Sequence, residues 1–352
     1  MDNLKIYALT LITFLSFFSC KEDSNIVINE NIKTFTSFKQ KDTIKFKKVV
    51  DFKKGVVGKI YIKDSALIIF NLDGKRDFFF YNYFLKNDSL SKGYLPGGKG
   101  PGEAIGGMSS GLKNNILWLH DLSLNKILVA DIEKKTSNNN KPLFKEYPIE
   151  NNFYMMEYQD SLNLFGVGYI NSLFKVQKVD LFTGKIKKQF GEFKYLPEDK
   201  PFSSYKTAYE PFILSKPSDD KIVLIYRFSD IIEIFDSNTT KSIAIHGPEM
   251  FYADFNSMSI KSMSIMARNS KTRISFVNCA VTDNYIYALY SGKLFNTKNS
   301  NFGMYVFVYD WNGNPIKKLI LDREAFSIAV SKNDKDIYIY DPKNGHIMKN
   351  KI

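Results

Sequence analysis

The residues best suited by type and spacing to chemistry lie in one glycine-rich stretch, LPGGKGPGEAIGG, at residues 95–107. It holds six of the 20 glycines of the chain, around Lys99 and Glu103. In a phosphate-binding loop the sequence Gly-Lys-Ser/Thr leads into a helix, whereas here Pro101 and Gly102 come after Lys99 and Gly100. A dinucleotide-binding GxGxxG loop lies in a βαβ unit, which this sequence does not show. We therefore expect a sharp backbone turn, in which Glu103 accepts backbone N–H bonds or pairs with Lys99. Direct ligand contact by Lys99 or Glu103 is the alternative.

Residues for metal or nucleophilic chemistry do not cluster in the sequence. His120, His246 and His346 fall in separate segments, which disfavours a shared metal site, and no HExxH, GxSxG or EF-hand pattern occurs. Cys279 lies in the apolar run ISFVNCAV, which predicts a buried core residue rather than a nucleophile. We expect no catalytic residue, no metal and no cofactor.

The N-terminus reads as an export signal. Lys5 precedes an uncharged, mostly apolar run at residues 6–18, too short to span a bilayer as a helix. The run ends in Ser19-Cys20, which resembles a bacterial lipobox and implies lipid attachment at Cys20; an ordinary signal peptide is the alternative. Lys21-Glu22-Asp23 then resembles the surface-export signal of Bacteroidetes lipoproteins. We expect an outer-membrane lipoprotein exposed at the cell surface, with the periplasmic face or a plain solvated tether as alternatives.

The charge balance points away from nucleic acid. The formal net charge is +12, but only five of the 49 basic residues are arginine. Arginine side chains are the ones that usually bind phosphate and guanine, because the guanidinium can form two parallel hydrogen bonds. In this chain nearly all basic residues are lysines, which are scattered through every segment. A solvated lysine surface is the expected interpretation.

Short strands broken by Gly, Asn and Asp fill the rest of the chain, and several can be superimposed. KVDLFTGKIKK (178–188), VYDWNGNPIKK (308–318) and IFDSNTTKSIA (234–244) each consist of an apolar strand ending in Asp, a polar turn and a second strand. With the strand pair upstream, each unit has four strands over roughly 40 to 50 residues, the repeat of a propeller blade.

Six such units can be counted, the sixth incomplete at the C-terminus. They cover residues 56–95, 108–149, 153–191, 205–246, 273–322 and 325 onward. DTIKFKKVV (42–50) is an orphan strand that could complete the sixth blade and close the ring, removing unpaired edges. The expected organisation is therefore a signal peptide at 1–19, the lipidated cysteine and a polar tether at 20–41, and an all-β, six-bladed propeller of four-stranded antiparallel blades at 42–352. A β-sandwich is the competing architecture.

Four quoted segments carry a resemblance to a known family. They are NYIYALYSGK (284–293), VFVYDWNGNPIKKLILD (306–322), FSIAVSKNDKDIYIYDP (326–342) and GKGPGE (98–103). Together they resemble the TolB-like six-bladed propeller lipoproteins of Bacteroidetes. The resemblance implies the fold and the export route, and it supplies no catalytic residues.

Propeller geometry places the long loops on one face. The segments 96–107, 247–272 and 291–303 all connect a blade to the next or its second strand to its third, and loops gathered at one end of a rigid scaffold commonly bind. On this face Arg227, Asp230 and Tyr290 are the best candidates for ligand binding, with blade packing as the alternative.

The insert 247–272 contains four methionines, Met250, Met258, Met263 and Met266, and is expected to be a short helix or flap. We expect these methionines to pack onto a neighbouring blade rather than to form an exposed binding surface.

The sequence thus favours a non-catalytic binding or interaction module anchored at the outer membrane. A glycan, a peptide or an envelope protein are the expected partners. A hydrolase or lyase acting at the channel mouth, and a passive component of an envelope complex, are the alternatives.

Overall fold

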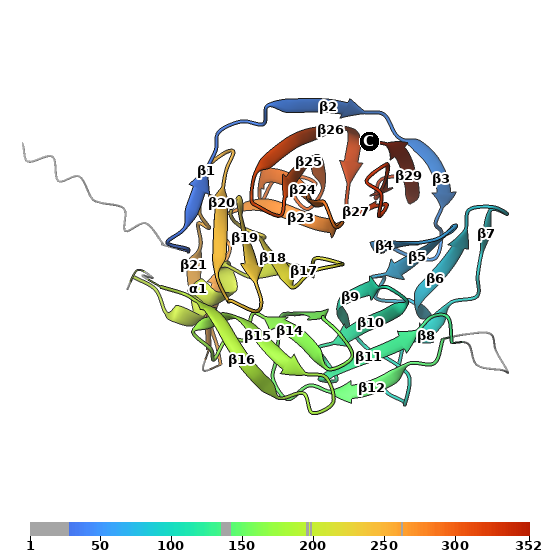
Figure 1. Cartoon of the computed structure of the whole chain (residues 1–352), viewed down its shortest axis with the longest axis horizontal. Helices are drawn as coiled ribbons and strands as arrows, with labels where there is room; N and C mark the ends of the chain where they lie inside the picture. Colours follow the sequence, from blue (N-terminus) through green and yellow to red (C-terminus); the bar gives the residue numbers. More distant parts are fainter. Residues whose placement is uncertain (1–27, 135–141, 195–196, 198, 262) are drawn as a thin grey trace, which may run out of the picture.

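A computed structural model describes residues 28–134, 142–194, 197, 199–261 and 263–352, which form six sheets arranged in a ring (Figure 1). The expected six-bladed all-β propeller is confirmed. The signal peptide, Cys20 and the segment 21–23 lie outside the described residues. None of the described helices is long and apolar enough to cross a membrane.

The first three blades follow the chain order, each starting at the axis. Blade 1 contains β4 (Val57–Lys63), β5 (Ala66–Asn71), β6 (Phe78–Phe84) and β7 (Ser89–Leu90), with β8 (Tyr94–Pro96) also paired to β6. Blade 2 contains β9 (Gly107–Lys113), β10 (Ile116–Asp121), β11 (Lys126–Asp131) and β12 (Lys145–Pro148). Blade 3 contains β13 (Met155–Tyr158), β14 (Asn163–Val167), β15 (Phe174–Asp180) and β16 (Ile186–Glu192).

The last three blades each gain a strand from the N-terminal segment. Blade 4 contains β17 (Pro211–Ser215), β18 (Lys221–Tyr226), β19 (Ile231–Asp236) and β20 (Ser242–His246), with β1 (Ile32–Thr34) at its edge. Blade 5 contains β23 (Arg273–Val281), β24 (Tyr285–Leu294), β25 (Gly303–Asp310) and β26 (Pro315–Ala325), with β2 (Gln40–Ile44) at its edge. Blade 6 contains β27 (Ser327–Val330), β28 (Asp336–Asp341), β29 (His346–Lys351) and β3 (Lys47–Asp51).

The aspartates that end the third strands explain the repeated sequence pattern. Oδ1 of Asp180 accepts the backbone N–H groups two and three residues further on, at 3.0 and 2.9 Å, and Asp236 does the same at 3.0 and 2.9 Å. Asp131 and Asp310 likewise accept the amide two residues on. A short carboxylate can satisfy the amides of the tight turn that follows it, so the same residue recurs where each hairpin turns.

The ring is closed as expected, by an N-terminal strand on blade 6. Strand β3 pairs antiparallel with β29, with Val50 opposite Ile347. The predicted single strand at 42–50 is in fact two strands, because the chain turns inward at Phe46, which is buried and donates its N–H to Asp322 at 3.3 Å. Residues before this turn pair with blade 5 and residues after it with blade 6.

The segment expected to be a polar tether belongs in part to the propeller, which corrects the predicted boundary at residue 42. Strand β1 pairs parallel with β20, and β2 pairs parallel with β26, so the chain runs along the outer rim of blades 4 and 5 (Figure 1). Ile28 and Phe38 are buried, and Asn29 donates to Glu233 at 2.6 Å. Backbone pairing and two buried apolar side chains together hold this otherwise polar segment on the propeller.

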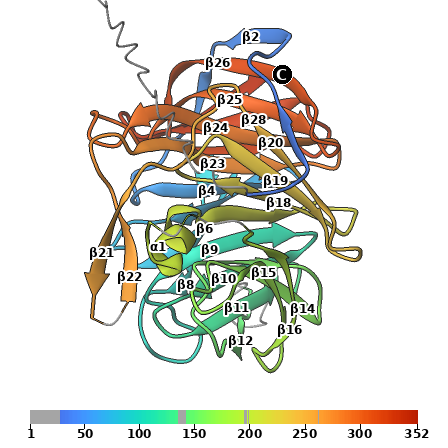
Figure 2. The same ribbon diagram turned by 90° about the vertical axis from the view of Figure 1, so that its left-hand side faces the viewer.

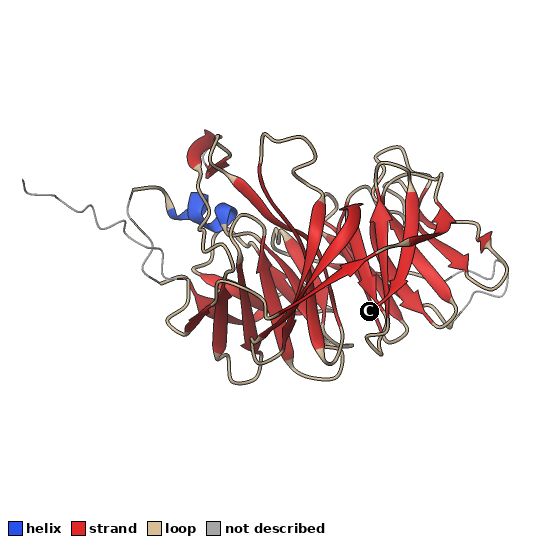
Figure 3. Ribbon diagram, turned by 90° about the horizontal axis from the view of Figure 1, so that it is seen from above, coloured by secondary structure: helices blue, strands red, loops and turns tan. Residues whose placement is uncertain are grey.

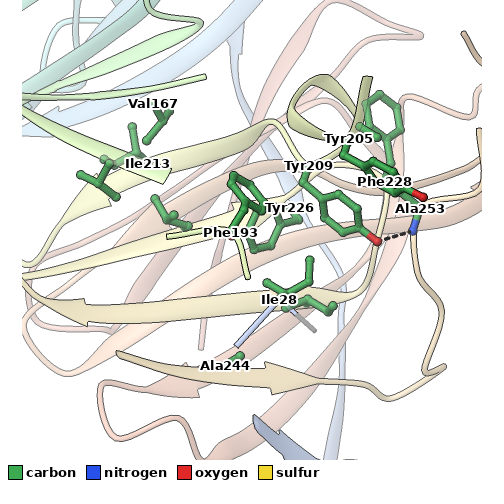
Figure 4. Packing of buried hydrophobic residues seen from close by; sticks show 14 of the residues in the cluster. Ile28, Val167, Phe193, Tyr205, Tyr209, Ile213, Tyr226, Phe228, Ala244 and Ala253 are labelled. Carbon is green, nitrogen blue, oxygen red and sulfur yellow. Dashed lines mark hydrogen bonds between the residues drawn. The ribbon is translucent and has the colours of Figure 1, made fainter. Parts of the chain in front are cut away.

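The fourth unit begins later than predicted. Tyr205 lies in α1 (Phe202–Ala208), a short helix between blades 3 and 4, and the first strand of blade 4 starts at Pro211. Tyr205 and Tyr209 pack into the cluster between these blades, where the hydroxyl of Tyr209 accepts the N–H of Ala253 at 3.3 Å (Figure 4). Burial of these aromatic rings outweighs the strand propensity of the local sequence.

The insert 247–272 forms a hairpin, not a helix, of β21 (Asn256–Ile260) and β22 (Met263–Ala267) (Figure 2). Met258 lies opposite Ile265 in the register, and Ile260 lies opposite Met263, so these apolar side chains share one face of the ribbon. Met266 points to the other face and packs towards α1.

The expectation that the four methionines are packed is therefore wrong for three of them. Met258 and Met263 are 45% and 43% exposed, because one face of a two-stranded ribbon has no neighbouring sheet to cover it. Met250, in the connection between β20 and the hairpin, is 40% exposed. In the edge-on view, α1 and the hairpin rise from the same side of the ring (Figure 3).

Candidate binding site at the channel mouth

A cavity of about 1150 Å³ follows the axis of the propeller. Its walls are the inner strands of the six blades, β4, β9, β13, β17, β23 and β27, together with the loops at the ends of these strands. Ligand-binding pockets have volumes of roughly 300–1,000 Å³, so this cavity can hold a molecule of several rings.

Two side-chain hydrogen bonds join the inner strands of blades 1 and 5, whose residues line the cavity. Lys59 Nζ donates to the carbonyl of Cys279 at 3.0 Å, and Asn278 Nδ2 donates to the carbonyl of Gly58 at 3.1 Å. Cys279 is buried as expected, and burial raises the pKa of its thiol to about 11. A thiol with this pKa stays protonated at neutral pH and is a poor nucleophile.

A carboxyl group and two hydroxyl groups lie on the inner strands of blades 1 to 3. Glu157 Oε1 accepts the backbone N–H of Ser215 at 3.0 Å, while the hydroxyls of Tyr61 and Ser110 are 2.7 Å apart. Burial raises the pKa of Glu157 to about 7, against the opposing attraction of Lys113 and Lys59. The wall can therefore donate and accept hydrogen bonds, and Glu157 changes charge near neutral pH.

Two arginines stand at the mouth, on the face that carries the long loops. Arg227 follows β18 and donates through Nη1 to the hydroxyl of Tyr154, which precedes β13. Arg268 follows β22 and lies 5.3 Å from the ring centres of Phe228 and Phe295. The guanidinium of Arg227 lies 5.6 Å from Phe228, so the two arginines share one aromatic ring.

Glu210 lies close enough to interact with both arginines. Burial raises the pKa of Glu210 to about 7, although Arg227 and Arg268 pull it down. Desolvation and the neighbouring Arg227 lower the pKa of Arg268. Yet among the described residues, no carboxylate lies within ion-pairing distance of either guanidinium, at 4.0 Å or less.

The structure places the sequence-predicted site residues in different environments. Arg227 lines the cavity, whereas Lys99 and Glu103 do not. Glu103 Oε2 accepts the N–H of Gly100 at 2.8 Å, and a side chain at position 98 would overlap the Glu103 carboxylate. The glycine loop is therefore a turn built around Glu103, and its Gly102 amide donates to Glu146 on the outermost strand of blade 2.

Asp230 and Tyr290 are buried in the core and do not line the cavity, so the structure does not bring them together with Arg227. Asp230 is 1% exposed and accepts three consecutive backbone N–H groups, those of residues 249–251, at 2.7–3.0 Å. Tyr290 is also 1% exposed and stacks on Phe307 with ring centres 4.4 Å apart. Tyr290 belongs to the apolar cluster between blades 4 and 5, and Asp230 holds the connection that follows β20.

Tyr154, Glu157, Glu210 and Arg268 were missed by sequence reasoning. Tyr154, Glu210 and Arg268 lie in three different connections, Glu157 lies within β13, and none of them belongs to a motif. The one available signal was that arginine is scarce in this sequence, so each arginine could have been considered a candidate. Arg268 lies in the same long insert as the four methionines. In the described part of the chain, no group of three or more His, Cys, Asp or Glu side chains is arranged to hold a metal.

The fold and the cavity define a six-bladed propeller with a ligand-sized axial cavity that opens among its long loops. The chain belongs to the TolB-like 6-blade propeller-like family, which matches residues 35–333. A search of curated proteins finds no match.

Solved structures share the fold at low sequence identity. A Bacteroides fragilis protein described as exported is 14% identical with a TM-score of 0.53, over 90% of this chain and 98% of that one. A member of the DUF4221 family from Bacteroides vulgatus is 10% identical with a TM-score of 0.52, over 90% of this chain and 95% of that one. Hydrazine synthase of Kuenenia stuttgartiensis is 10% identical with a TM-score of 0.50, over 86% and 97%. At these identities the likeness concerns the fold alone.

Proposed function

We propose that this protein is a non-catalytic binding module that takes its ligand into the axial cavity from the face of the long loops. The observation that carries the proposal is the cavity itself, about 1150 Å³ in volume and lined by aromatic, hydroxyl and charged side chains. Convergent polar groups in a largely apolar concavity are the usual composition of a ligand site.

A screen with a channel-blocking variant tests this function. The soluble chain 21–352 and two variants of it would be applied to glycan and peptide arrays. Val277→Trp places a large ring on the cavity wall. Leu162→Trp, the control, places the same ring on an exposed turn. We expect a ligand whose binding is lost in Val277→Trp and kept in Leu162→Trp, with both variants still showing cooperative melting. Equal binding by a folded Val277→Trp would place the ligand elsewhere.

We further propose that the module acts outside the cytoplasm, anchored at the outer membrane by a lipid on Cys20. The supporting observations are the order of charged, apolar and small residues before Cys20 and the fold shared with an exported Bacteroides fragilis protein. Labelling of cells with a palmitate analogue should mark the protein, and Cys20→Ala should abolish the label. Protease treatment of intact cells would then distinguish the cell surface from the periplasmic face.

A further inference from the structure

We propose that Arg227 and Arg268 together bind the carboxylate of an acidic saccharide at the mouth of the axial cavity, an inference that rests on the binding function proposed above. Both guanidinium groups line the cavity, and they approach it from different blade connections. Their convergence is a property of the tertiary structure.

The other three arginines of the chain are occupied by structural contacts. Arg76 donates to the carbonyls of Asp73 and Ile105, both at 2.7 Å. Arg273 donates to the carbonyl of Gly292 at 2.7 and 2.9 Å and pairs with a carboxylate, and Arg323 pairs with Asp322 at 3.0 Å.

Arg227 and Arg268 differ from these three. Among the described side chains, Arg227 has one hydrogen-bond acceptor, Tyr154, and Arg268 has none. Each guanidinium carries five N–H donors, so most of the donors at the mouth remain available to a ligand.

Aromatic rings hold both groups in place without using these donors. Arg227 lies 5.7 Å from the ring centre of Phe212 and 5.6 Å from that of Phe228, and Arg268 lies 5.3 Å from Phe228 and Phe295. A guanidinium attracted to a ring face keeps its N–H groups free to form the forked hydrogen bonds that match a carboxylate. The two positive charges are therefore held near each other, and a bound anion would reduce the repulsion between them.

The charge of the mouth fits a monoanion. With Glu210 ionised, the two arginines and Glu210 sum to one positive charge, which matches one carboxylate. An ionised Glu210 would repel a phosphate dianion more strongly than a singly charged carboxylate, so the carboxylate is the better partner.

The chemistry of the cavity walls suits a saccharide. They combine aromatic rings, those of Phe212 and Phe302, with single hydroxyl, carboxyl and amine groups on Tyr61, Glu157 and Lys113. This mixture suits a molecule with apolar ring faces and a hydroxyl at nearly every edge. An extended peptide would pair its backbone with a strand edge, and each of the six inner strands has one unpaired edge, so the test below includes an acidic peptide.

The test is calorimetric titration of the chain 21–352 with trigalacturonate, its fully methyl-esterified form and triglutamate. We expect trigalacturonate to bind and the uncharged ester to bind at least tenfold more weakly. Arg268→Gln and Arg227→Gln should each weaken trigalacturonate binding at least tenfold. Lys271→Gln removes one positive charge from the same insert, outside the cavity, and should change affinity less than twofold.

Arg268 is exposed, so its substitution tests the proposal even if Arg227→Gln fails to fold. Absence of trigalacturonate binding, equal binding of the ester, unchanged affinity in Arg268→Gln, or tighter binding of triglutamate would each overturn the proposal. A neutral ligand that binds the native chain and both arginine variants with equal affinity, and does not bind Val277→Trp, would overturn the inference and support the binding function. Failure of the function itself would show as the lack of any ligand sensitive to Val277→Trp.

Discussion

The hydroxyl of Tyr154, just ahead of the first strand of blade 3, accepts a hydrogen bond from Nη1 of Arg227, just after the second strand of blade 4. This bond crosses the boundary between two blades at the mouth of the axial cavity. It orients one of the two guanidiniums that we propose to bind an anion, and it ties the geometry of the mouth to the packing of the propeller.

Tyr154→Phe removes only this hydroxyl. We expect trigalacturonate affinity to fall about three- to tenfold, because Arg227 loses the acceptor that fixes its position, while the free energy of unfolding changes by about 1 kcal/mol or less. Calorimetric titration and urea unfolding measure the two quantities. An unchanged affinity with a lowered stability would show that the bond only holds the blades together.

Glu210 should make anion binding depend on pH. The groups that face it are Arg227 and Arg268, and its pKa of about 7 means that it is mostly neutral at pH 6 and mostly charged at pH 8. A carboxylate ligand stays ionised over this range, so its affinity should be several-fold higher at pH 6 than at pH 8. Glu210→Gln should give the higher affinity at both values. A pH dependence that persists in Glu210→Gln would assign it to another group.

Glu157 should lower stability above neutral pH. Its pKa is about 7 in the folded protein against an ordinary value of 4.5, so the folded state holds the proton to higher pH. Its contribution is fully favourable below about pH 4.5 and is lost as the pH rises through 7. Glu157→Gln keeps an oxygen for the Ser215 amide and should stabilise the protein by on the order of 2 kcal/mol at pH 8, and by little at pH 4.5. Urea unfolding at both pH values checks this, and equal effects at both would contradict the assignment.

Asp230 should be a structural residue with a large effect. Asp230→Asn replaces a carboxylate oxygen that accepts backbone N–H groups with an amide donor, and we expect a loss of about 2–4 kcal/mol in the free energy of unfolding. Glu103→Gln retains an acceptor for the single Gly100 amide and should cost less than about 1 kcal/mol. Neither residue lines the cavity, so a folded sample of either variant should bind as the native chain does.

Closure of the ring depends on β3. Val50 is 3% exposed and lies opposite Ile347, whereas Lys48 on the same strand is exposed. Val50→Asp buries an unpaired charge at the closure and should reduce stability by about 3 kcal/mol or more, while Lys48→Asp should change it by about 0.5 kcal/mol or less. Similar melting curves for the two variants would mean that β3 contributes little to closure.

The sequence predicted the repeating part of this fold well. The blades consist of short strands rich in apolar residues, and in blades 2 to 5 the third strand ends in an aspartate that caps the turn after it, as Asp180 and Asp236 do. These signals are local, so five of the six unit starts and the closing strand could be placed to within a few residues. The edge strand β1 and the pairing of β2 with blade 5 were not predicted, because an edge strand buries few side chains and shows little alternation.

By itself the sequence determined the six-bladed ring, since period-two patterning and turn chemistry act between near neighbours in the chain. Only the tertiary structure decided which side chains meet at the mouth. Arg227 and Asp230 are three residues apart in one connection, yet one faces the cavity and the other is buried under three backbone amides. Which way each side chain turns depends on the loops packed around it, and those loops come from residues distant in the chain.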